Sequence, residues 1–263
     1  MKNATKLMTT ALALGLALIA ASSAQATVLL SEGFNYVNGN LVPNGGWATY
    51  SGAGTDIQVV SGRATGGAIG NPAIDDHRLF PAQPLTSKTY ACFEVTIPAF
   101  TGAPKAIYFA ELKDGGAAAL VSRVYVLPIS GGWTFGISHS STSTTVGVVP
   151  WSSSTLSFDT PYQLVINYDP VALSSTLWVN PVNEFSTSVS ITNTAAAAVA
   201  VSGFGLRQSN AASTLPPSPS YAGTADWNFS VDNLGVGTTF DDACFQVTPT
   251  NRSTWGQLKV IYR

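Results

Sequence analysis

The stretch Asp226-Trp-Asn-Phe-Ser-Val-Asp-Asn-Leu-Gly-Val-Gly237 decides the fold, because it combines strand alternation with one change of phase. Up to Val231, its apolar residues alternate with polar ones, which is the pattern of a half-buried β-strand. Leu234 and Val236 then carry the apolar role on the opposite phase. This change indicates a β-bulge at Asp232-Asn233 or a strand end that is buried on both faces. We interpret the segment as the last main strand of a two-sheet β domain.

The rest of the chain repeats this pattern in short runs of alternating apolar residues, separated by turn-forming pairs such as Ser61-Gly62 and Gly131-Gly132. No long segment has helical periodicity. The run from Ala195 to Leu206 begins with four alanines, but its later valines and glycines favour a strand over a helix. About a dozen short strands with regular turn signals predict an all-β fold, a two-sheet antiparallel jelly-roll sandwich in one domain.

Residues 1–26 have the features of a secretory signal peptide. Lys2 and Lys6 precede an apolar run from Ala11 to Ala20, and the segment ends with a small-residue cleavage pattern, Ala24-Gln-Ala26. The run is too short to span a bilayer, and an uncleaved membrane anchor is the alternative. We therefore expect a mature chain that begins at Thr27, carries no membrane span, and is secreted to the extracellular space or the cell surface.

Charged side chains make up 10% of the chain, against about a quarter in ordinary globular domains. Without residues 1–26, ten basic and fourteen acidic side chains remain, a net charge of about −4, and no basic cluster is present. Nucleic acid and anionic membrane surfaces both require a local excess of positive charge. The composition therefore argues against both partners, and it permits close packing between subunits.

Cys92 and Cys244 are the two cysteines. An exported chain meets an oxidising compartment, so we predict a disulfide between them, with two unpaired thiols as the alternative. In the runs Ala91-Cys-Phe-Glu-Val95 and Ala243-Cys-Phe-Gln-Val247, each cysteine lies on the less apolar phase, as a bridge between neighbouring strands requires. Closing a loop of about 150 residues would stabilise the fold by roughly 4–5 kcal/mol in the loop-entropy model.

Four segments of the chain, in this order, resemble bacterial secreted domains of the concanavalin A-like lectin/glucanase class, the LamG-like jelly rolls. They are Leu29-Leu-Ser-Glu-Gly-Phe-Asn-Tyr36, Ile57-Gln-Val-Val-Ser-Gly62, Leu206-Arg-Gln208 and Val231-Asp-Asn-Leu-Gly-Val-Gly-Thr-Thr-Phe240. The resemblance implies two antiparallel sheets with the first and last strands close together. We assign residues 27–250 to this domain. The class hosts lectins, glycosidases and adhesion modules, so the resemblance is weak for function.

Catalytic patterns are missing from the sequence. The glucanase branch of the class places carboxylates at alternate positions of one strand, about 5–5.5 Å apart in retaining enzymes. The glutamates and the residues two positions after them are Glu32 with Phe34, Glu94 with Thr96, Glu111 with Lys113, and Glu184 with Ser186. No Gly-x-Ser-x-Gly or His-Glu-x-x-His occurs, and His77 and His139 are predicted to have surface or turn roles. We predict a non-enzyme, while carboxylates from different strands leave a glycoside hydrolase as an alternative.

We predict no cofactor and no dedicated metal site, since no Asp-x-Asp-x-Asp loop is present. Structural calcium is one use for Asp226, Asp232, Asp241 and Asp242 together with backbone carbonyls. Strand-end hydrogen bonding is the alternative use of these four side chains.

Sugar binding requires an aromatic face that stacks on the apolar side of a pyranose ring, next to hydrogen-bonding groups. Trp178 is the best candidate, because its neighbours take the core phase and leave it on the other face with Asn180. Arg123 and Tyr125 share one phase of another strand and are expected to join it. The alternative is that these residues pack inside the domain.

The tail, residues 251–263, lies outside the predicted domain. It has three possible roles: docking on its own domain, recognition by an export system, or self-association by adding a strand to a neighbouring subunit. We expect a secreted, non-catalytic module that binds a polysaccharide or cell-surface glycan and acts in adhesion. A structural subunit of an extracellular fibre or matrix is the alternative, supported by the sparse charge and the apolar tail.

Overall fold

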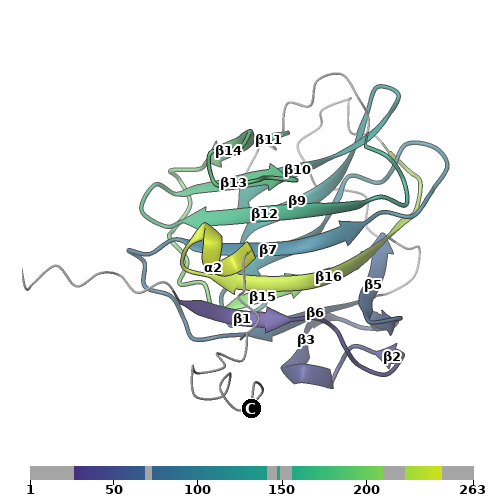
Figure 1. Cartoon of the computed structure of the whole chain (residues 1–263), viewed down its shortest axis with the longest axis horizontal. Coiled ribbons are helices and arrows are strands. Elements are labelled where there is room, and N and C mark those ends of the chain that lie inside the picture. Colours follow the sequence, from purple (N-terminus) through teal and green to yellow (C-terminus); the bar gives the residue numbers. More distant parts are fainter. Residues whose placement is uncertain (1–26, 69–72, 141–146, 149–155, 210–222, 245–263) are drawn as a thin grey trace, which may run out of the picture.

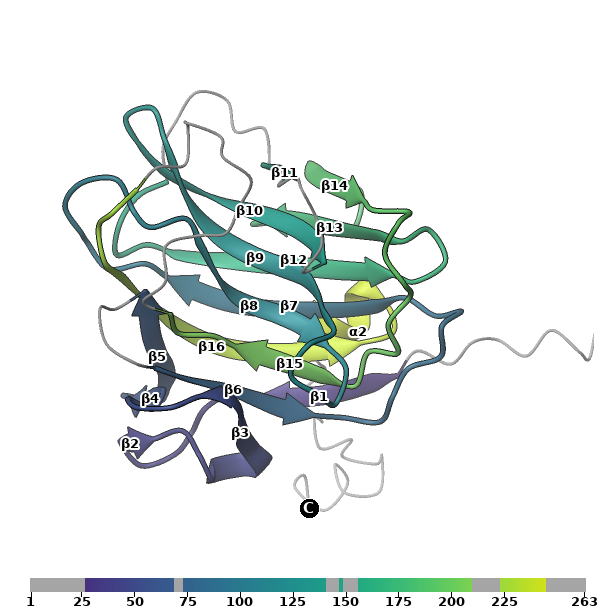
Figure 2. The same ribbon diagram turned by 180° about the vertical axis from the view of Figure 1, so that it is seen from behind.

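The computed structural model describes residues 27–68, 73–140, 147–148, 156–209 and 223–244, which form two antiparallel β-sheets packed face to face (Figure 1). Sheet A runs in the order β14-β13-β12-β7-β16-β5-β4-β2, and β1 pairs with β16. Sheet B runs in the order β11-β10-β9-β8-β15-β6-β3 and faces the viewer in Figure 2. The predicted jelly-roll sandwich is therefore confirmed.

The strands of sheet A are β1 (Val28–Glu32), β2 (Gly39–Asn40), β4 (Gln58–Val60), β5 (Arg63–Ala68), β7 (Thr89–Thr96), β12 (Pro161–Asp169), β13 (Ser174–Val179), β14 (Ser188–Thr192) and β16 (Trp227–Gly237). The strands of sheet B are β3 (Trp47–Gly52), β6 (Ile74–Leu79), β8 (Ile107–Lys113), β9 (Leu120–Ile129), β10 (Gly132–Ser140), β11 (Gly147–Val148) and β15 (Gly203–Leu206). The described helices are the short 3-10 turn η1 (Asn44–Gly46) and α2 (Phe240–Cys244). Within the described ranges, no helix is long and apolar enough to cross a membrane.

Strand β16 has the central place that the sequence predicts for it. It pairs with β7 and β5, and its far half pairs with β1, so the first and last strands are neighbours. Its register against β7 shifts between Asp232 and Gly235, and Asn233 adopts a φ of 51°. This bulge lets Val231 before it and Leu234 after it both reach the core. The predicted change of phase is confirmed.

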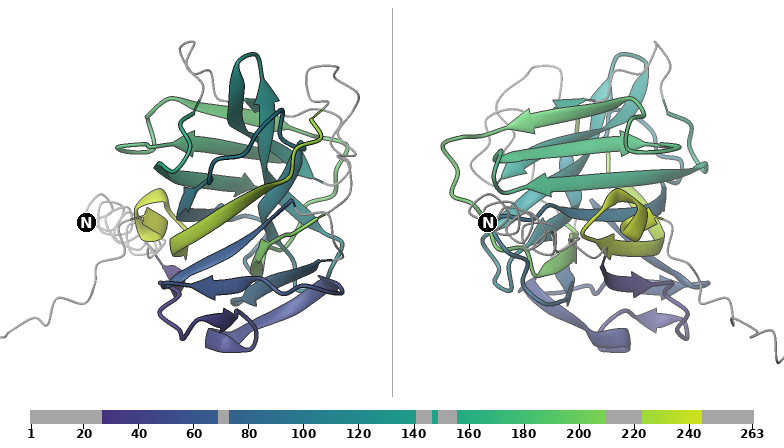
Figure 3. Two further views of the ribbon diagram at one scale, coloured as in Figure 1. Left: turned by 90° about the vertical axis from the view of Figure 1, so that its right-hand side faces the viewer. Right: turned by 60° about the vertical axis from the view of Figure 1, so that its left-hand side comes forward.

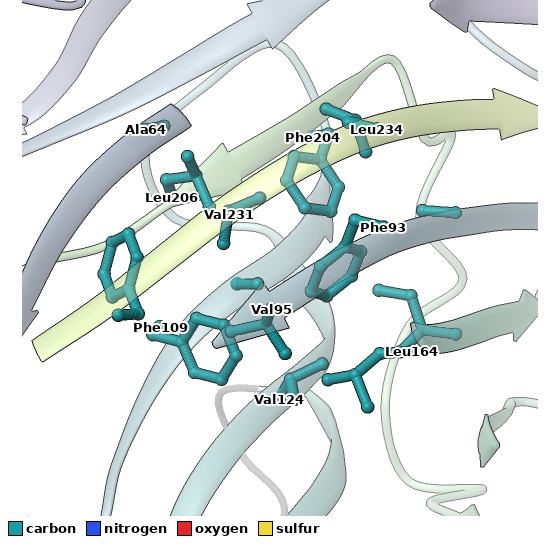
Figure 4. Close-up of a cluster of buried hydrophobic side chains, with 14 of the residues drawn as sticks. Ala64, Phe93, Val95, Phe109, Val124, Leu164, Phe204, Leu206, Val231 and Leu234 are labelled. Carbon is teal, nitrogen blue, oxygen red and sulfur yellow. The ribbon is translucent and has the colours of Figure 1, made fainter. Parts of the chain in front are cut away.

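The core lies between the sheets and is filled by the inward-facing residues of both (Figure 4). Phe93 of sheet A and Phe204 of sheet B meet edge to face with ring centroids 5.3 Å apart. Phe109 and Phe229 pair across the sheets at 5.4 Å. Since successive strand residues point to opposite faces, each sheet also has an outer face on which a site can be built.

Two segments that the sequence predicts as strands differ from the structure. In the 195–206 run only Gly203–Leu206 forms a strand, because alanine offers little side chain to pack on a pleated surface. Ala243 and Cys244 belong to helix α2 and not to a strand. The Thr239 hydroxyl caps this helix by accepting from the Asp242 backbone N–H at 3.2 Å. Helix α2 lies against the outer side of sheet A (Figure 3).

Candidate functional site

The outer face of sheet B carries a cluster of ionisable and aromatic side chains, here called the sheet B cluster. The register of β8 against β9 shifts between Tyr108 and Leu112, so Phe109 and Leu112 both enter the core although they are three residues apart. Glu111 and Lys113 lie opposite Gly205 and Gly203 of β15 and face outward with them. The cluster consists of Tyr50, Asp75, His77, Tyr108, Glu111, Lys113, Arg123, Tyr125 and Arg207.

Strand β15 makes room for the cluster because glycine alternates with core residues along it. Phe204 and Leu206 point into the core, while Gly203 and Gly205 face the cluster. A Cβ atom on Gly205 would overlap the carboxyl oxygen of Glu111 and lie 2.9 Å from its Cδ. The missing side chain therefore lets Glu111 lie across β15, between β8 and β6.

Glu111 is completely buried, and its carboxylate accepts a hydrogen bond from one tyrosine hydroxyl. The Tyr50 hydroxyl donates a hydrogen bond to Oε1 of Glu111. The other oxygen, Oε2, has no hydrogen-bond partner within the described part of the chain. Burial raises the pKa of Glu111, since a charged carboxylate is poorly solvated there. The pKa of Tyr50 is raised as well, first by burial and then by Glu111.

Lys113 lies beside this pair with its ammonium group fully hydrogen-bonded. Its Nζ contacts Nδ1 of His77 at 2.9 Å, the carbonyl of Asp114 at 2.9 Å, and the carbonyl of Gly116. Three acceptors match the three hydrogens of an ammonium group. Burial and the nearby Lys113 charge lower the pKa of His77 to about 4, so its Nδ1 is an acceptor near neutral pH. Tyr50 covers both, with its ring 4.5 Å from Nζ.

Two arginines approach the ring of Tyr108 on the other side of the cluster. The guanidinium carbons of Arg207 and Arg123 lie 4.4 Å and 4.9 Å from its centroid, within cation–π range. Arg123 also donates to Oγ of Ser138 at 3.1 Å. The Nε of Arg207 lies 3.7 Å from Oδ2 of Asp75. Burial raises the pKa of Asp75 to about 7, and the Arg207 charge opposes this effect.

Exposure divides the cluster into two layers. Tyr50, Tyr108 and Arg207 are half-buried and form its accessible surface. Glu111 and Lys113 lie beneath them without exposed area. The tyrosine rings and the guanidinium group of Arg207 thus lie at the surface, and the buried, hydrogen-bonded side chains of Glu111 and Lys113 lie beneath them. Such groups can stack on a sugar ring and hydrogen-bond its substituents.

The structure does not bring the predicted sugar-binding residues together. Arg123 and Tyr125 belong to the sheet B cluster, whereas Trp178 lies on β13 of sheet A. Trp178 is 5% exposed and packs against Phe240 of helix α2 with ring centroids 5.7 Å apart. The sequence correctly places Trp178 on the face opposite the core, but α2 covers that face. The prediction that Trp178 forms an exposed surface for stacking on a sugar is therefore wrong.

Asn180 has a local structural role. It adopts a left-handed φ of 48°, and its Oδ1 accepts the backbone N–H of Gln163 at 2.8 Å. Asparagine tolerates this conformation better than most residues, so the position is explained by the turn at the end of β13.

The predicted surface or turn roles of the two histidines are wrong. His77 lies within β6 and His139 within β10, and both are buried. The Nδ1 of His139 lies 3.1 Å from Oγ of Ser175, and its ring stacks on Tyr168. Burial lowers the pKa of His139. Its partners and its burial assign it to the interior of the sandwich, away from the outer face of sheet B.

The four aspartates predicted as possible calcium ligands make other interactions in the structure. Asp232 forms an ion pair with Arg63, and Asp226 forms one with Lys105. Asp241 and Asp242 lie in the first turn of α2, where the helix dipole favours negative charge. Within the described ranges, no group of three His, Cys, Asp or Glu side chains is arranged to hold a metal ion.

Cys92 and Cys244 are free thiols in this structure, so the predicted disulfide is not formed in it. They are nevertheless neighbours, because helix α2 places Cys244 beside β7. A hydrogen bond to Cys92 is the largest cause of the raised pKa of Cys244. The bridge between these two residues stays a prediction, and the bridged elements would be a strand and a helix.

Gly205→Ala is expected to destabilise the fold by about 2 kcal/mol, because the added methyl group displaces Glu111 from a packed site. Thermal unfolding would then occur roughly 4–8 °C lower. Gly115→Ala is the matched control, since a Cβ there meets only Oγ of Ser202 at 3.7 Å. Equal unfolding temperatures for the two variants would contradict the role of Gly205.

Comparison with known proteins finds similar folds and no close relative. No protein-family model matches the sequence, and no curated protein matches it. The alginate lyase Aly36B has a TM-score of 0.50 at 14% identity, over 79% of this chain and 95% of the lyase chain. A sialidase has a TM-score of 0.50 at 11% identity, over 83% of this chain and 19% of the sialidase chain.

A third similar structure is that of botulinum neurotoxin type C, whose cell entry is described as dependent upon interaction with two ganglioside molecules. Its TM-score is 0.50 at 6% identity, over 81% of this chain and 48% of the toxin chain. This chain thus spans about a fifth of the sialidase chain and about half of the toxin chain. At these identities the likenesses show a shared β-sandwich fold.

Proposed function

We propose that this chain is a secreted, non-catalytic module that binds acidic glycans through the sheet B cluster and serves adhesion at a cell surface. The observation that carries the proposal is the half-buried ring of Tyr108, with the guanidinium carbons of Arg207 and Arg123 at 4.4 Å and 4.9 Å from its centroid. An aromatic face beside fixed hydrogen-bond donors is what a pyranose ring requires.

Arg207 is the group best placed to contact a ligand. Its side chain is half-buried, and its interaction with Asp75 is a 3.7 Å contact through Nε. Among the described residues, its two terminal nitrogens have no hydrogen-bond partner. A guanidinium group with two free parallel donors matches the two oxygens of a carboxylate. Arg207 is therefore the proposed anchor for an acidic sugar.

The charge balance of the cluster supports an acidic ligand. Arg207 and Arg123 bring two guanidinium groups to one face, and Lys113 lies beneath them with a pKa that burial lowers. The two acidic members, Glu111 and Asp75, have pKa values raised by burial, to about 7 for Asp75. Burial thus disfavours the charged forms of both carboxyl groups, whereas the two guanidinium groups stay charged, which favours an anionic ligand although the chain as a whole has a net charge of −2.

The test is binding of the mature chain to acidic and neutral polysaccharides, measured by calorimetry at low and high salt. Polygalacturonate, alginate and hyaluronate serve as acidic probes, and dextran serves as the neutral one. We expect salt-sensitive binding to at least one acidic probe. Arg207→Ala should weaken it about tenfold or more, since a hydrogen bond to a charged group is worth about 1.5–3 kcal/mol. Tyr108→Ala should also weaken it, because it removes the aromatic face on which the sugar ring stacks.

Lys88→Ala is the control, because it removes a positive charge at an exposed ion pair with Asp169, outside the cluster. Its affinity should equal that of the parent chain. Binding that is unchanged in Arg207→Ala and Tyr108→Ala, or no binding to any acidic probe, would remove the sheet B cluster as the site.

Polysaccharide cleavage is the second candidate function, and one observation favours it. Glu111 and Asp75 come from β8 and β6, meet in one cluster, and have raised pKa values, which is the setting of a general acid. The sequence left such an assembly from different strands open. Product release in the same incubations, lost in Glu111→Gln, would replace the non-catalytic proposal with an enzymatic one.

A further inference from the structure

A pocket of about 390 Å³ lies apart from the sheet B cluster, at residues of the strands β4, β5 and β16 of sheet A. These three strands are labelled in Figure 2. Residues of these three strands line it together with the loop before β4, Pro98 and Gln208. Its volume falls in the range of about 300–1,000 Å³ that small-molecule sites occupy.

A row of three polar side chains crosses the pocket from strand to strand. In the sheet register Gln58 faces Thr65, and Thr65 faces Ser230. Directly opposed residues in antiparallel strands point to the same side of the sheet, so the three side chains form one row. All three residues belong to the pocket lining.

The hydrogen bonds within the protein leave this row with oxygen acceptors. The Thr65 hydroxyl donates to the carbonyl of Gln58 at 3.1 Å, and Nε of Arg63 donates to Oγ of Ser230 at 2.7 Å. The side-chain amide of Gln58 donates to Oδ1 of Asn40 at 2.9 Å and to the carbonyl of Asp56 at 3.1 Å. The donors of Thr65 and Gln58 are therefore used, whereas the Ser230 hydroxyl accepts from Arg63 and has no acceptor for its own hydrogen among the described residues. The row thus offers a ligand the lone pairs of the Thr65 and Gln58 side-chain oxygens and the hydroxyl of Ser230.

Gln208 has a side-chain acceptor in a fixed orientation. It is 4% exposed, and its side-chain Nε2 donates to the carbonyls of Thr55 at 2.8 Å and Ile74 at 3.3 Å. Both amide hydrogens are therefore used, and Oε1 is held in one orientation. A Cβ atom on Gly66 would lie 3.1 Å from this oxygen and 2.7 Å from Cζ of the core residue Phe229, so Gln208 Oε1 occupies the side of β5 opposite to the Thr65 side chain.

The chemistry of the lining selects a ligand class. Among the described lining residues there is no lysine or arginine, and the acidic one, Asp56, already accepts a hydrogen bond from Asn40. The nearest cation is the guanidinium of Arg63, which donates to Ser230 and is already paired with Glu94 and Asp232. Carboxylate or sulfate groups would therefore find no unpaired cation among the described residues here. Sugar hydroxyl groups can donate to the side-chain oxygens of Gln58 and Thr65 and accept from the hydroxyl of Ser230. The geometry points to a second saccharide site, selective for a neutral sugar residue, in this pocket.

This inference goes beyond the proposed acidic-glycan function and does not depend on it. The two sites differ in charge: Arg207 and its neighbours suit an acidic sugar, whereas the pocket suits an uncharged one. A chain with both sites would hold a polysaccharide that contains acidic and neutral residues, or two different glycans. Gln208 lies between the sites, because its backbone N–H donates to Oδ1 of Asp75 at 3.0 Å.

The test is an NMR titration of the isotope-labelled mature chain with the methyl glycosides of glucose, galactose and mannose. Methyl glucuronide and methyl galacturonide are the charged counterparts. At least one neutral glycoside should give saturable shifts of the side-chain amide signals of Gln58, Gln208 and Asn228, which line the pocket. The charged counterparts should shift these signals with at least about fivefold lower affinity.

Thr65→Val removes one acceptor at nearly constant shape and should weaken neutral-sugar binding about fivefold. Asn228→Ala is a second pocket variant, at an exposed position. Thr176→Val is the matched control, because Thr176 is a half-buried strand residue of sheet A whose hydroxyl bonds Ser190 at 3.1 Å. Its affinity should be unchanged.

No saturable shift of the pocket amides with any neutral glycoside would overturn the inference. Equal affinity for the charged sugars, or equal affinity in Thr65→Val and the parent chain, would overturn it as well. The signals of Tyr108 and Arg207 report on the sheet B cluster in the same spectra. Failure of the pocket and failure of the acidic-glycan site are therefore read separately.

Discussion

Oxidation of the mature chain is expected to join Cys92 and Cys244 and to stabilise the fold by about 4 kcal/mol, since the bond closes a loop of about 150 residues. The two thiols already interact, and Cys244 is half-buried at the end of helix α2. Oxidised glutathione would accept the two electrons and two protons by thiol–disulfide exchange. The unfolding temperature should rise by roughly 8–16 °C.

Intact mass and alkylation would establish the bond, and calorimetry with and without reductant would measure its effect. Cys244→Ser is the control, because the oxidant should leave its unfolding temperature unchanged. Two alkylatable thiols after complete equilibration would favour the alternative of unpaired cysteines. A bond that forms without stabilising the chain would mean that helix α2 is strained by it.

Glu32→Ala is expected to destabilise the fold by about 3–5 kcal/mol, the range for breaking a buried ion pair. The Glu32 carboxylate accepts the backbone N–H of Phe34 at 2.7 Å, the hydroxyl of Tyr36 at 2.7 Å and Nε1 of Trp47 at 3.1 Å. It also pairs with Arg78. One side chain of β1 thus joins sheet A to β3 and β6 of sheet B, and its loss leaves several buried donors unpaired.

Glu94→Ala is the matched control for Glu32→Ala. Glu94 also pairs with an arginine, Arg63, but its side chain is 33% exposed, and such ion pairs contribute at most about 1 kcal/mol. Urea unfolding of both variants measures the difference in free energy. Similar losses in the two variants would contradict the role of Glu32 as a link between the sheets.

The sequence predicts the strands well wherever apolar residues alternate. Trp227, Phe229 and Val231 are buried on one phase and Leu234 on the other, as the pattern requires. Prediction fails where alternation is weak. The alanines before β15 and the short helix α2 look like strands in the sequence, because a few apolar residues fit both periods.

The residues of the candidate site can be predicted from the sequence only in part. Arg123 and Tyr125 were placed on an outward phase, and both belong to the sheet B cluster. Asp75 and Arg207 were not singled out for sugar binding, because each comes from a separate strand or strand end with no local motif. The alternation of glycine and apolar residues in 203–206 is the signal that marks a crowded outer face.

The sequence by itself determined which residues of each strand face the core, because alternation along a strand is a local property of the backbone. Only the tertiary structure decided which parts of the two outer faces are accessible. Helix α2 covers Trp178 on sheet A, whereas register across β6, β15 and β8 assembles Asp75, Glu111 and their neighbours on sheet B. Both outcomes depend on contacts between residues far apart in the chain, and these contacts follow from strand order and register.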